Sequence, residues 1–312
     1  MLVSLEPPSL TIEMWIPEFA CPECEADLSP QAEVCWCTRC GRQFGYRDGM
    51  WRFLTPARIA ALGPFLAQYR VVRGGDGHRQ ASPEYYRMLP SVAEDHPQAG
   101  EWRVRRQTYH HLLRHVLAAG PQSVRVLDLG AGSAWLSHRL AELGHHTVAV
   151  DVLDDEADGL GAARHYRSKF PIVQADFNAL PFLPHQFDLV VFNGSLHYAH
   201  DVADALVRAR EMLAPGGALI VMDSPMFHSD RDGQAMAAEQ VRRFRFEYGL
   251  ATVVQAGAGY LTFPLLEAAA GALQMQPAFL PSRGPFVWRI KRRLSSLRLG
   301  RAPAAFGLWV AR

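Results

Sequence analysis

The chain has 312 residues, of which 49% are hydrophobic and 20% charged, and its formal net charge is +1. This near-neutral total gives no general electrostatic reason to bind nucleic acid or acidic membranes, and no apolar run reaches the roughly 18 residues that span a bilayer. The N-terminal stretch MLVSLEPPSLTIEMWIPEFA has glutamates and no basic start, which is not typical of a signal peptide. We therefore expect a cytoplasmic protein with one large and one smaller domain.

All five cysteines lie between residues 21 and 40, and four of them form two C-x2-C pairs: Cys21, Cys24, Cys37 and Cys40. Each pair can place two thiolates on one ion, and a tetrahedron of four thiolates favours zinc. Such a shell has no open position, so we expect a structural zinc ion in a small zinc ribbon over residues 1–54. Cys35 could replace Cys37 only by breaking the spacing. The ribbon either grips a substrate or partner, or is a module that packs on the main domain.

Residues 55–120 are assigned to a helical linker or cap region. Residues 55–100 are rich in Pro and Gly, and RGGDGHRQASPEYY predicts a loop that leads into a short helix. From Glu101 to Ala118 apolar residues recur at steps of three and four, which predicts a helix that ends at Gly120 and Pro121. This helix either covers a cofactor or lies on the outside of a sheet.

Residues 121–312 form the third segment, in which strand and helix patterns alternate from Val124. Such alternation predicts a mostly parallel sheet covered on both faces, with ligands at the carboxyl ends of the strands. One helix is expected over 201–213 after Asp201, a residue type favoured as N-cap. The strands are expected near residues 124–129, 147–151, 171–175, 187–192 and 217–223.

The turn after the first of these strands indicates a nucleoside-bearing cofactor. Gly130 and Gly132 fit the dinucleotide fingerprint, but Trp135 stands where its third glycine belongs. Asp128, two residues before the turn, would be a poor neighbour for a pyrophosphate and suits the ammonium group of S-adenosylmethionine. Asp151 ends the second strand at the usual distance for a carboxylate that accepts both ribose hydroxyls. Asp176 ends the third strand, where it could accept from the adenine amine, with Phe177 beside the ring.

The stretch from 124 to about 225 resembles the class I S-adenosylmethionine-dependent methyltransferases of the type 11 kind. VLDLGAG, VAVDV, QADFNALPF, FDLVVFNGSLHYAHD and LAPGGALIVMDSP follow the motif order of that family. The resemblance implies an α/β fold with a Rossmann-like, doubly wound, mostly parallel seven-stranded sheet, whose reversed last strand would be AAFGLWVAR.

The resemblance also implies a set of cofactor-binding positions. Asp128, Gly130 and Gly132 would line the methionine side, Asp151 would hold the ribose, and Asp176 with Phe177 the adenine. Further cofactor contacts are expected at Ala131, Val152 and Asn193. The family often has another glycine where this chain has Ala134, and we expect this small replacement to preserve binding.

Methyl transfer from a sulfonium needs an aligned acceptor and exclusion of water, and it needs a base only if the acceptor is protonated. The best-placed residues follow the fourth strand, in NGSLHYAH. His197 and Tyr198 are the candidate catalytic residues, although a purely structural role for His197 remains an alternative. His200 lies in the same stretch, and Asp223 and His228 are weaker candidates.

Two acceptor classes remain open, with a small molecule favoured over RNA. The ribbon ahead of the domain is partly similar to bacterial 23S rRNA guanine-N1 methyltransferases, whose last ligand is typically His where this chain has Cys40. The basic run WRIKRRLSSLRLGR could meet phosphates, but its apolar Ile290, Leu294, Leu297 and Leu299 favour a packed amphipathic helix with solvated arginines.

The insertion MFHSDRDGQAMAAEQVRRFRFEYG could instead form a helical lid over a small acceptor. A third hypothesis is a non-catalytic, cofactor-binding scaffold in which the ribbon is the working part.

Overall fold

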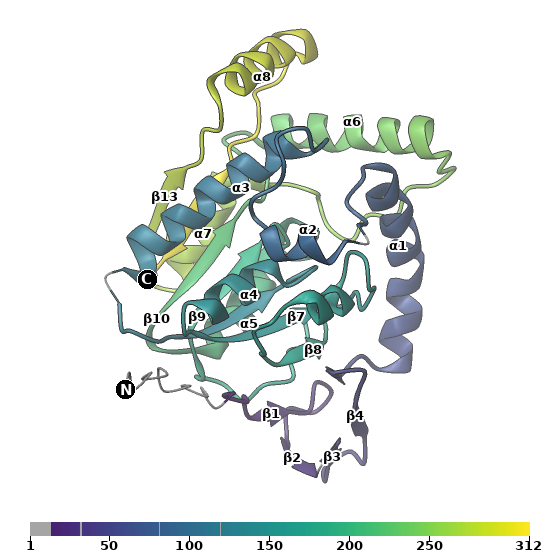
Figure 1. Cartoon of the computed structure of the whole chain (residues 1–312), viewed down its shortest axis with the longest axis vertical. Helices are drawn as coiled ribbons and strands as arrows, with labels where there is room; N and C mark the ends of the chain where they lie inside the picture. Colours follow the sequence, from purple (N-terminus) through teal and green to yellow (C-terminus); the bar gives the residue numbers. More distant parts are fainter. Residues whose placement is uncertain (1–13, 32, 81, 119) are drawn as a thin grey trace, which may run out of the picture.

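The computed structural model describes residues 14–31, 33–80, 82–118 and 120–312, and a single large sheet runs through them (Figure 1). Its strand order is β1-β2-β3-β4-β5-β8-β7-β6-β9-β10-β14-β13. The strands of this sheet are β1 (Phe19–Ala20), β2 (Asp27–Gln31), β3 (Val34–Cys37), β4 (Gln43–Arg47), β5 (Met50–Arg52), β6 (Arg125–Leu129), β7 (His146–Asp151), β8 (Ile172–Gln174), β9 (Phe187–Asn193), β10 (Leu213–Met222), β13 (Pro277–Pro281) and β14 (Gly307–Ala311). A separate parallel pair joins β11 (Met226–Phe227) to β12 (Leu261–Thr262).

Helices pack on both faces of this sheet. The helices of the described residues are α1 (Pro56–Gly75), α2 (Pro83–Met88), α3 (Ala99–Leu112), α4 (Trp135–Glu142), α5 (Val202–Met212), α6 (Asp230–Tyr248), α7 (Phe263–Ala272) and α8 (Phe286–Leu299), with the short turns η1 (Leu113–Leu117), η2 (Leu160–His165) and η3 (Leu196–Tyr198). Within the described ranges, no helix has the length and apolarity needed to cross a membrane.

The seven strands from β8 to β13 form the sheet that the sequence predicts. The pairs β8·β7, β7·β6, β6·β9 and β9·β10 are parallel. The strand β14, near the C-terminus, lies antiparallel between β10 and β13, so the reversed last strand is confirmed. The helix α5 begins after Asp201, whose carboxylate accepts from the backbone amides of Ala203 and Asp204 as the expected N-cap.

Strand residues are buried on both faces because helices cover both sides. In β9, Val190 and Phe192 belong to the core that α5 and α7 complete. Leu189 and Val191, on the other face, belong to the core that α3 and α4 complete. This burial explains the nearly continuous apolar strands in the sequence and confirms the doubly wound arrangement.

The cysteine-bearing strands β1–β5 extend the same sheet at its β8 edge. Trp51 of β5 lies opposite Val173 of β8 in a parallel pair. The backbone amide of Phe53 donates to the carbonyl of Gln174 at 2.8 Å. The Phe53 ring lies 5.0 Å from that of Phe19 and 5.1 Å from that of Phe44, and these rings join the α5–α7 core.

The helix α1 is not predicted from the sequence, because the hydrophobic periodicity of residues 55–75 is weak. Thr55 caps its start by accepting from the amide of Arg58 at 3.3 Å, and Pro56 occupies the first turn. No residue of α1 is fully buried, so there is no apolar stripe to reveal it. The expected short helix is α2, and the helix predicted over 101–118 is α3 continued by η1.

The expectation of a packed C-terminal amphipathic helix is wrong. The basic run does form α8, but this helix projects from the body of the molecule (Figure 1). Ile290, Leu294 and Leu299 are 42–57% exposed, so these positions are not covered by the rest of the chain. The side chain of Leu297 lies outside the described part.

Phe53→Ala should lower the free energy of unfolding by about 3–5 kcal/mol, because it removes a buried ring from the junction between β5 and β8. The measurement is chemical denaturation followed by tryptophan fluorescence. Trp36→Ala is the matched control, because Trp36 lies on β3 and is 45% exposed. Equal midpoints for the two variants would contradict this packing.

Candidate active site

A cavity of about 660 Å³ opens at the carboxyl ends of four neighbouring strands. Gly130 follows β6, Asp151 ends β7, Asn193 ends β9 and Asp223 follows β10, and all four line it. This is the edge where the parallel topology predicts a ligand site.

The turn after β6 requires glycine and is fixed to β7. Gly130 has φ +71°, and a Cβ there would come within 2.2 Å of the Ser195 side chain. The amide of Gly132 donates to Oδ2 of Asp151 at 2.8 Å, and that of Leu153 donates to Oδ1 at 2.8 Å. Each carboxylate oxygen keeps a further lone pair for a ligand hydroxyl. Burial raises the pKa of Asp151 above its ordinary value.

Ala134 stands at a position where glycine has a physical advantage. It precedes α4 with φ +57°, in the left-handed region, and is fully buried. The chain adopts this conformation without glycine, and preserved cofactor binding with alanine at this position stays a prediction.

Most of the predicted cofactor residues border the cavity: Gly130, Ala131, Gly132, Asp151, Val152, Phe177 and Asn193. Asp128 does not line it. Its side chain is fully buried between β6 and α4, where the hydroxyl of Ser137 donates to Oδ2 at 2.9 Å. Burial raises the pKa of Asp128 to about 7. Asp128 therefore joins strand to helix in this structure.

Asp176 also lies outside the cavity lining. Its Oδ2 accepts from Nε of Arg58 on α1, and its Oδ1 accepts from the amide and the side-chain nitrogen of Asn178 at 2.9 and 2.8 Å. An adenine amine would have to share a carboxylate that Arg58 and Asn178 already use. The sequence could not indicate this pair, because its partners are 118 positions apart.

His197 and Tyr198 both border the cavity. Nδ1 of His197 lies 3.1 Å from Oγ of Ser224, and burial lowers the pKa of His197 to about 3, which keeps the ring neutral near pH 7. The Tyr198 ring lies 5.9 Å from the rings of both Phe65 and Tyr69, and burial raises its pKa. His200 and His228 are not among the lining residues of the described cavity.

Two helices ahead of β6 add functional groups that sequence reasoning missed. From α1 come Phe65, Tyr69 and Arg73, and from α3 come Glu101 and Arg105. Arg73 is neutralised by Asp158 through bonds of 2.6 and 2.7 Å. The hydrophobic periodicity of α3 predicts a helix and could have indicated which face of it carries Arg105. The hydrophobic periodicity of α1 is too weak to indicate Phe65, Tyr69 or Arg73 in this way.

The inserted helix α6 lies over the cavity as expected of a lid. Met236, Gln240, Val241 and Phe244 of this helix line it. The helix is joined to the end of α1, where Arg243 pairs with Asp76 at 2.8 Å. The cavity is thus bordered by the sheet edge, α1, α3 and α6.

Asp223 is held under strain at the tip of β10. Its φ is +56°, which side-chain-bearing residues seldom adopt. Thr108 of α3 donates to Oδ1 at 2.7 Å, whereas the buried Oδ2 has no partner among the described residues. Burial raises the pKa of Asp223 to about 6, against opposing effects of Arg105 and Thr108.

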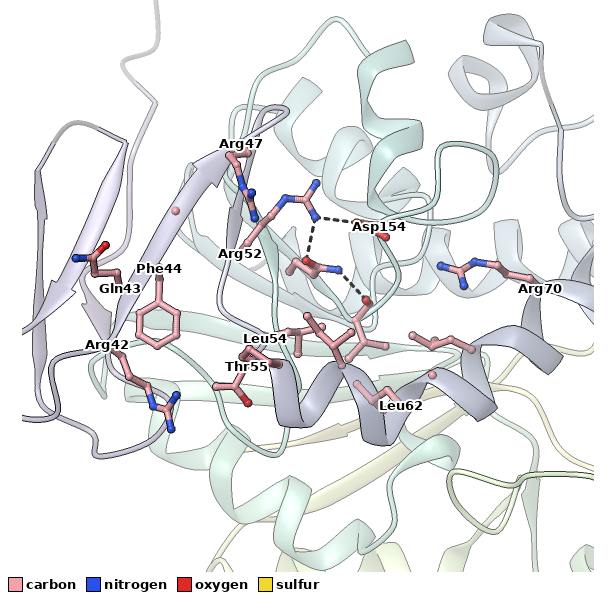
Figure 2. Close-up of a pocket in the computed structure, with 17 residues that line it drawn as sticks. Arg42, Gln43, Phe44, Arg47, Arg52, Leu54, Thr55, Leu62, Arg70 and Asp154 are labelled. Carbon is pink, nitrogen blue, oxygen red and sulfur yellow. Dashed lines mark hydrogen bonds and ion pairs between the residues drawn. The ribbon is translucent and has the colours of Figure 1, made fainter.

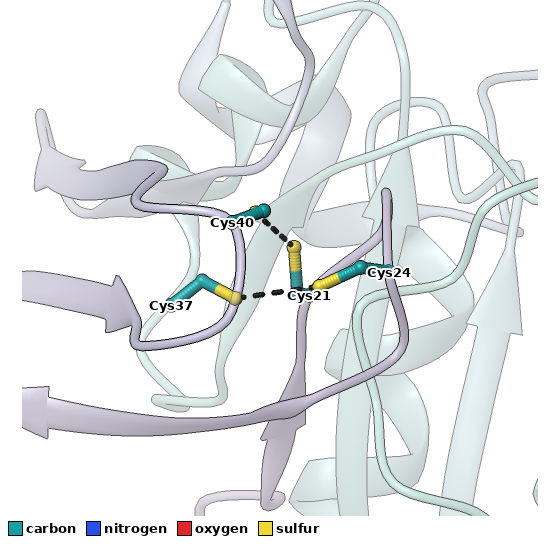
Figure 3. A group of neighbouring side chains, drawn as sticks. All are labelled: Cys21, Cys24, Cys37 and Cys40. Atoms are coloured by element: carbon teal, nitrogen blue, oxygen red, sulfur yellow. Dashed lines mark hydrogen bonds between the residues drawn. The ribbon is translucent and has the colours of Figure 1, made fainter.

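The four predicted cysteine ligands converge, as Figure 3 shows. Their sulfur atoms all lie within 4.8 Å of one another, with Cys21 to Cys40 at 3.6 Å and Cys24 to Cys37 at 3.4 Å. A tetrahedral zinc–thiolate site has sulfur atoms about 3.8 Å apart. The cluster can therefore hold a zinc ion, and Cys35 is buried outside it.

A second cavity of about 570 Å³ lies between the cysteine-bearing strands and α1 (Figure 2). Four arginines reach it: Arg42, Arg47, Arg52 and Arg70. Nη1 of Arg52 pairs with Asp154 at 2.7 Å. Leu66 and Val152 line both cavities, so the two spaces adjoin beside Asp151.

Comparisons with known proteins agree with this geometry. Residues 127–221 match the family model described as a methyltransferase domain. A malonyl-acyl-carrier-protein O-methyltransferase from Chlorobium luteolum is 34% identical over 127 residues, covering 38% of this chain and 48% of that protein. A demethylmenaquinone methyltransferase from Corynebacterium efficiens is 35% identical over 99 residues, covering 32% of this chain and 41% of that protein. The chain thus spans about half or less of the length of these curated relatives.

A solved structure from Galdieria sulphuraria, named as a candidate sarcosine dimethylglycine methyltransferase, covers 79% of this chain and 98% of its own. Its TM-score is 0.51 and its sequence identity is 12%, so the likeness shows the fold alone. Residues 127–221 are therefore similar to a methyltransferase domain, and the chain has the Rossmann-like mixed sheet of this structural neighbour.

Asp223→Asn should raise the free energy of unfolding at pH 7.5 by about 3 kcal/mol, because it removes a buried charge whose pKa is raised to about 6. A raised carboxyl pKa gives a penalty that is absent below about pH 4, grows between about pH 4 and 6, and is complete above that range. Urea unfolding should therefore show a smaller gain at pH 5.0 than at pH 7.5. Asp95→Asn, at an exposed position, is the control, and a pH-independent gain would contradict the assignment.

Proposed function

We propose that this protein is an S-adenosylmethionine-dependent methyltransferase that acts on a small-molecule acceptor. The observation that carries the proposal is Asp151. Its carboxylate is fixed at the tip of β7 by the glycine turn, borders the large cavity, and retains acceptor capacity for two hydroxyls. The match of residues 127–221 to a methyltransferase domain supports the same conclusion.

The cavity residues fit the parts of this cofactor. Asp151 would accept from the ribose hydroxyls, and Val152 and Phe177 would contact the adenine. Gly130, Ala131, Gly132 and Asn193 would surround the methionine part, where the glycines let the backbone approach closely. When bound, the cofactor would supply an activated methyl group. Asp128 would not contact the cofactor. It would instead hold the turn in place through its hydrogen bond with Ser137.

The acceptor would lie beyond Asn193, among His197, Tyr198 and Asp223. The partly buried, neutral His197 is a weak base, so we assign it to positioning the acceptor through the ring nitrogen that does not contact Ser224. Tyr198, with Phe65 and Tyr69, would exclude water from the reacting atoms.

A cavity of about 660 Å³ has the size of a typical small-molecule site. The relatives that name an acceptor act on an acyl-carrier-protein-linked malonyl group and on a quinone, which supports a compact acceptor group. No specific feature of the described structure favours an RNA acceptor or a non-catalytic scaffold, so we propose neither.

We further propose a structural zinc ion at the cysteine cluster. Four converging thiolates would close its shell and leave no position for a reactant. Its role would be to hold together strands β1–β5, whose aromatic residues reach the main core.

Asp151→Ala should weaken binding of S-adenosylhomocysteine by at least about tenfold, because two ribose hydroxyls lose a charged acceptor. Isothermal titration calorimetry measures this effect. Asp154→Ala is the control, because Asp154 lies three residues further on and borders only the second cavity. Unchanged affinity in Asp151→Ala would reject the assignment.

Metal analysis of protein purified without chelator should find one zinc per chain. Replacing Cys24 and Cys37 by Ser should remove it and lower the melting temperature, whereas Cys35→Ser should retain it, because Cys35 lies outside the cluster. A folded wild-type protein without metal would refute the zinc site.

A further inference from the structure

Arg105 of α3 lines the half of the cavity that we assign to the acceptor. It lies on the face of α3 that also carries Glu101, Val104 and Thr108, at helical steps of three and four. Val104 and Arg105 line the cavity, and Thr108, one turn later, is bonded to Asp223. Arg105 therefore lies on the part of α3 next to the tip of β10, in a cavity that His197 after β9 also lines.

The guanidinium of Arg105 has no anionic partner in the described part of the chain. It forms no hydrogen bond or ion pair there, and it stacks 4.9 Å from the centroid of the Trp102 ring. Glu101, one turn earlier, is exposed and not paired with it. Asp223 is held by Thr108 beyond ion-pair distance from Arg105. Arg73 of the same cavity is by contrast paired with Asp158 through two hydrogen bonds.

Electrostatics then restricts the acceptor, on the basis of the proposed function. The cofactor would bring a sulfonium cation into a cavity in which the Arg105 guanidinium has no direct ion-pair partner among the described residues, although the carboxylates of Glu101, Asp151 and Asp223 also line it. A neutral acceptor would leave the donors of this guanidinium without an anionic partner. An anionic acceptor group would provide that partner and would also lie close to the sulfonium. The planar fork of a guanidinium matches a carboxylate with two parallel hydrogen bonds.

We propose that Arg105 binds a carboxylate of the methyl acceptor, so that the substrates of this protein are small carboxylic acids. The competing ligand for Arg105 is the carboxylate of the cofactor itself. The position of Arg105 on α3, one turn before the Thr108 that bonds to Asp223 after β10, favours the acceptor, because the cofactor residues Gly130 and Gly132 follow β6 and Asp151 ends β7, further along the sheet edge.

The test uses the full chain saturated with S-adenosylhomocysteine and titrated by calorimetry with matched probes. The probes are acetate, malonate and benzoate, their amides, and methyl and phenyl phosphate. We expect saturable binding of at least one acid, with its amide at least about tenfold weaker. Arg105→Gln should weaken binding of that acid by about 10- to 100-fold, and Arg105→Lys should restore part of it.

The matched control is Arg106→Gln, because Arg106 is the next residue of α3, is exposed and does not line the cavity. It should leave acid binding within about twofold of wild type. Binding of S-adenosylhomocysteine to Arg105→Gln should also stay within about twofold, which shows that the variant is folded.

Four outcomes would overturn the proposal. These are no saturable binding of any acid, equal binding of acids and amides, tighter binding of the phosphates, and unchanged acid binding by Arg105→Gln. A loss of S-adenosylhomocysteine binding in folded Arg105→Gln would instead assign Arg105 to the cofactor carboxylate and equally reject the proposal. Failure of wild-type protein to bind S-adenosylhomocysteine would reject the proposed function itself, so the two failures are distinguishable.

Discussion

The bond from the Gly132 amide to the Asp151 carboxylate is the contact on which the site depends. It joins the turn after β6 to the tip of β7, two neighbouring parallel strands whose register already places their carboxyl ends together. The same carboxylate accepts from Leu153, so its orientation is set before any ligand arrives. A preoriented acceptor loses little entropy on binding a ribose. Because the glycines of this turn carry no side chain, a ligand in the cavity can approach the backbone of the turn closely.

The remaining walls come from helices that ion pairs fix to the sheet. Arg58 of α1 pairs with Asp176 after β8, and Arg73 pairs with Asp158 after β7. The far end of α1 is bonded to α6 through Asp76. An arginine that is already paired with a carboxylate offers little attraction to a ligand, whereas a cavity-lining arginine without such a partner favours an anionic ligand. The contrast between Arg73 and Arg105 therefore carries more information on specificity than the number of arginines in the cavity.

The sequence predicts the central sheet and several residues at the strand tips that line the cavity, for a physical reason. Strands buried on both faces are apolar throughout, and polar residues that interrupt them at their ends, such as Asp151 and Asn193, fall at one sheet edge. The sequence predicts the walls poorly. The helix α1 buries no residue completely and so has no apolar stripe, and Arg58 meets Asp176 only through the tertiary fold. Asp128 belongs to the motif that predicts the cofactor site, but its burial against Ser137 depends on how α4 packs on β6, which the motif does not indicate.

The most direct test of the account is a crystal structure of the protein with S-adenosylhomocysteine. The account predicts ribose hydroxyls within hydrogen-bond distance of the Asp151 carboxylate, the adenine between Val152 and Phe177, and the sulfur atom facing His197 and Tyr198. A ligand bound elsewhere, or one whose ribose lies away from Asp151, would contradict it.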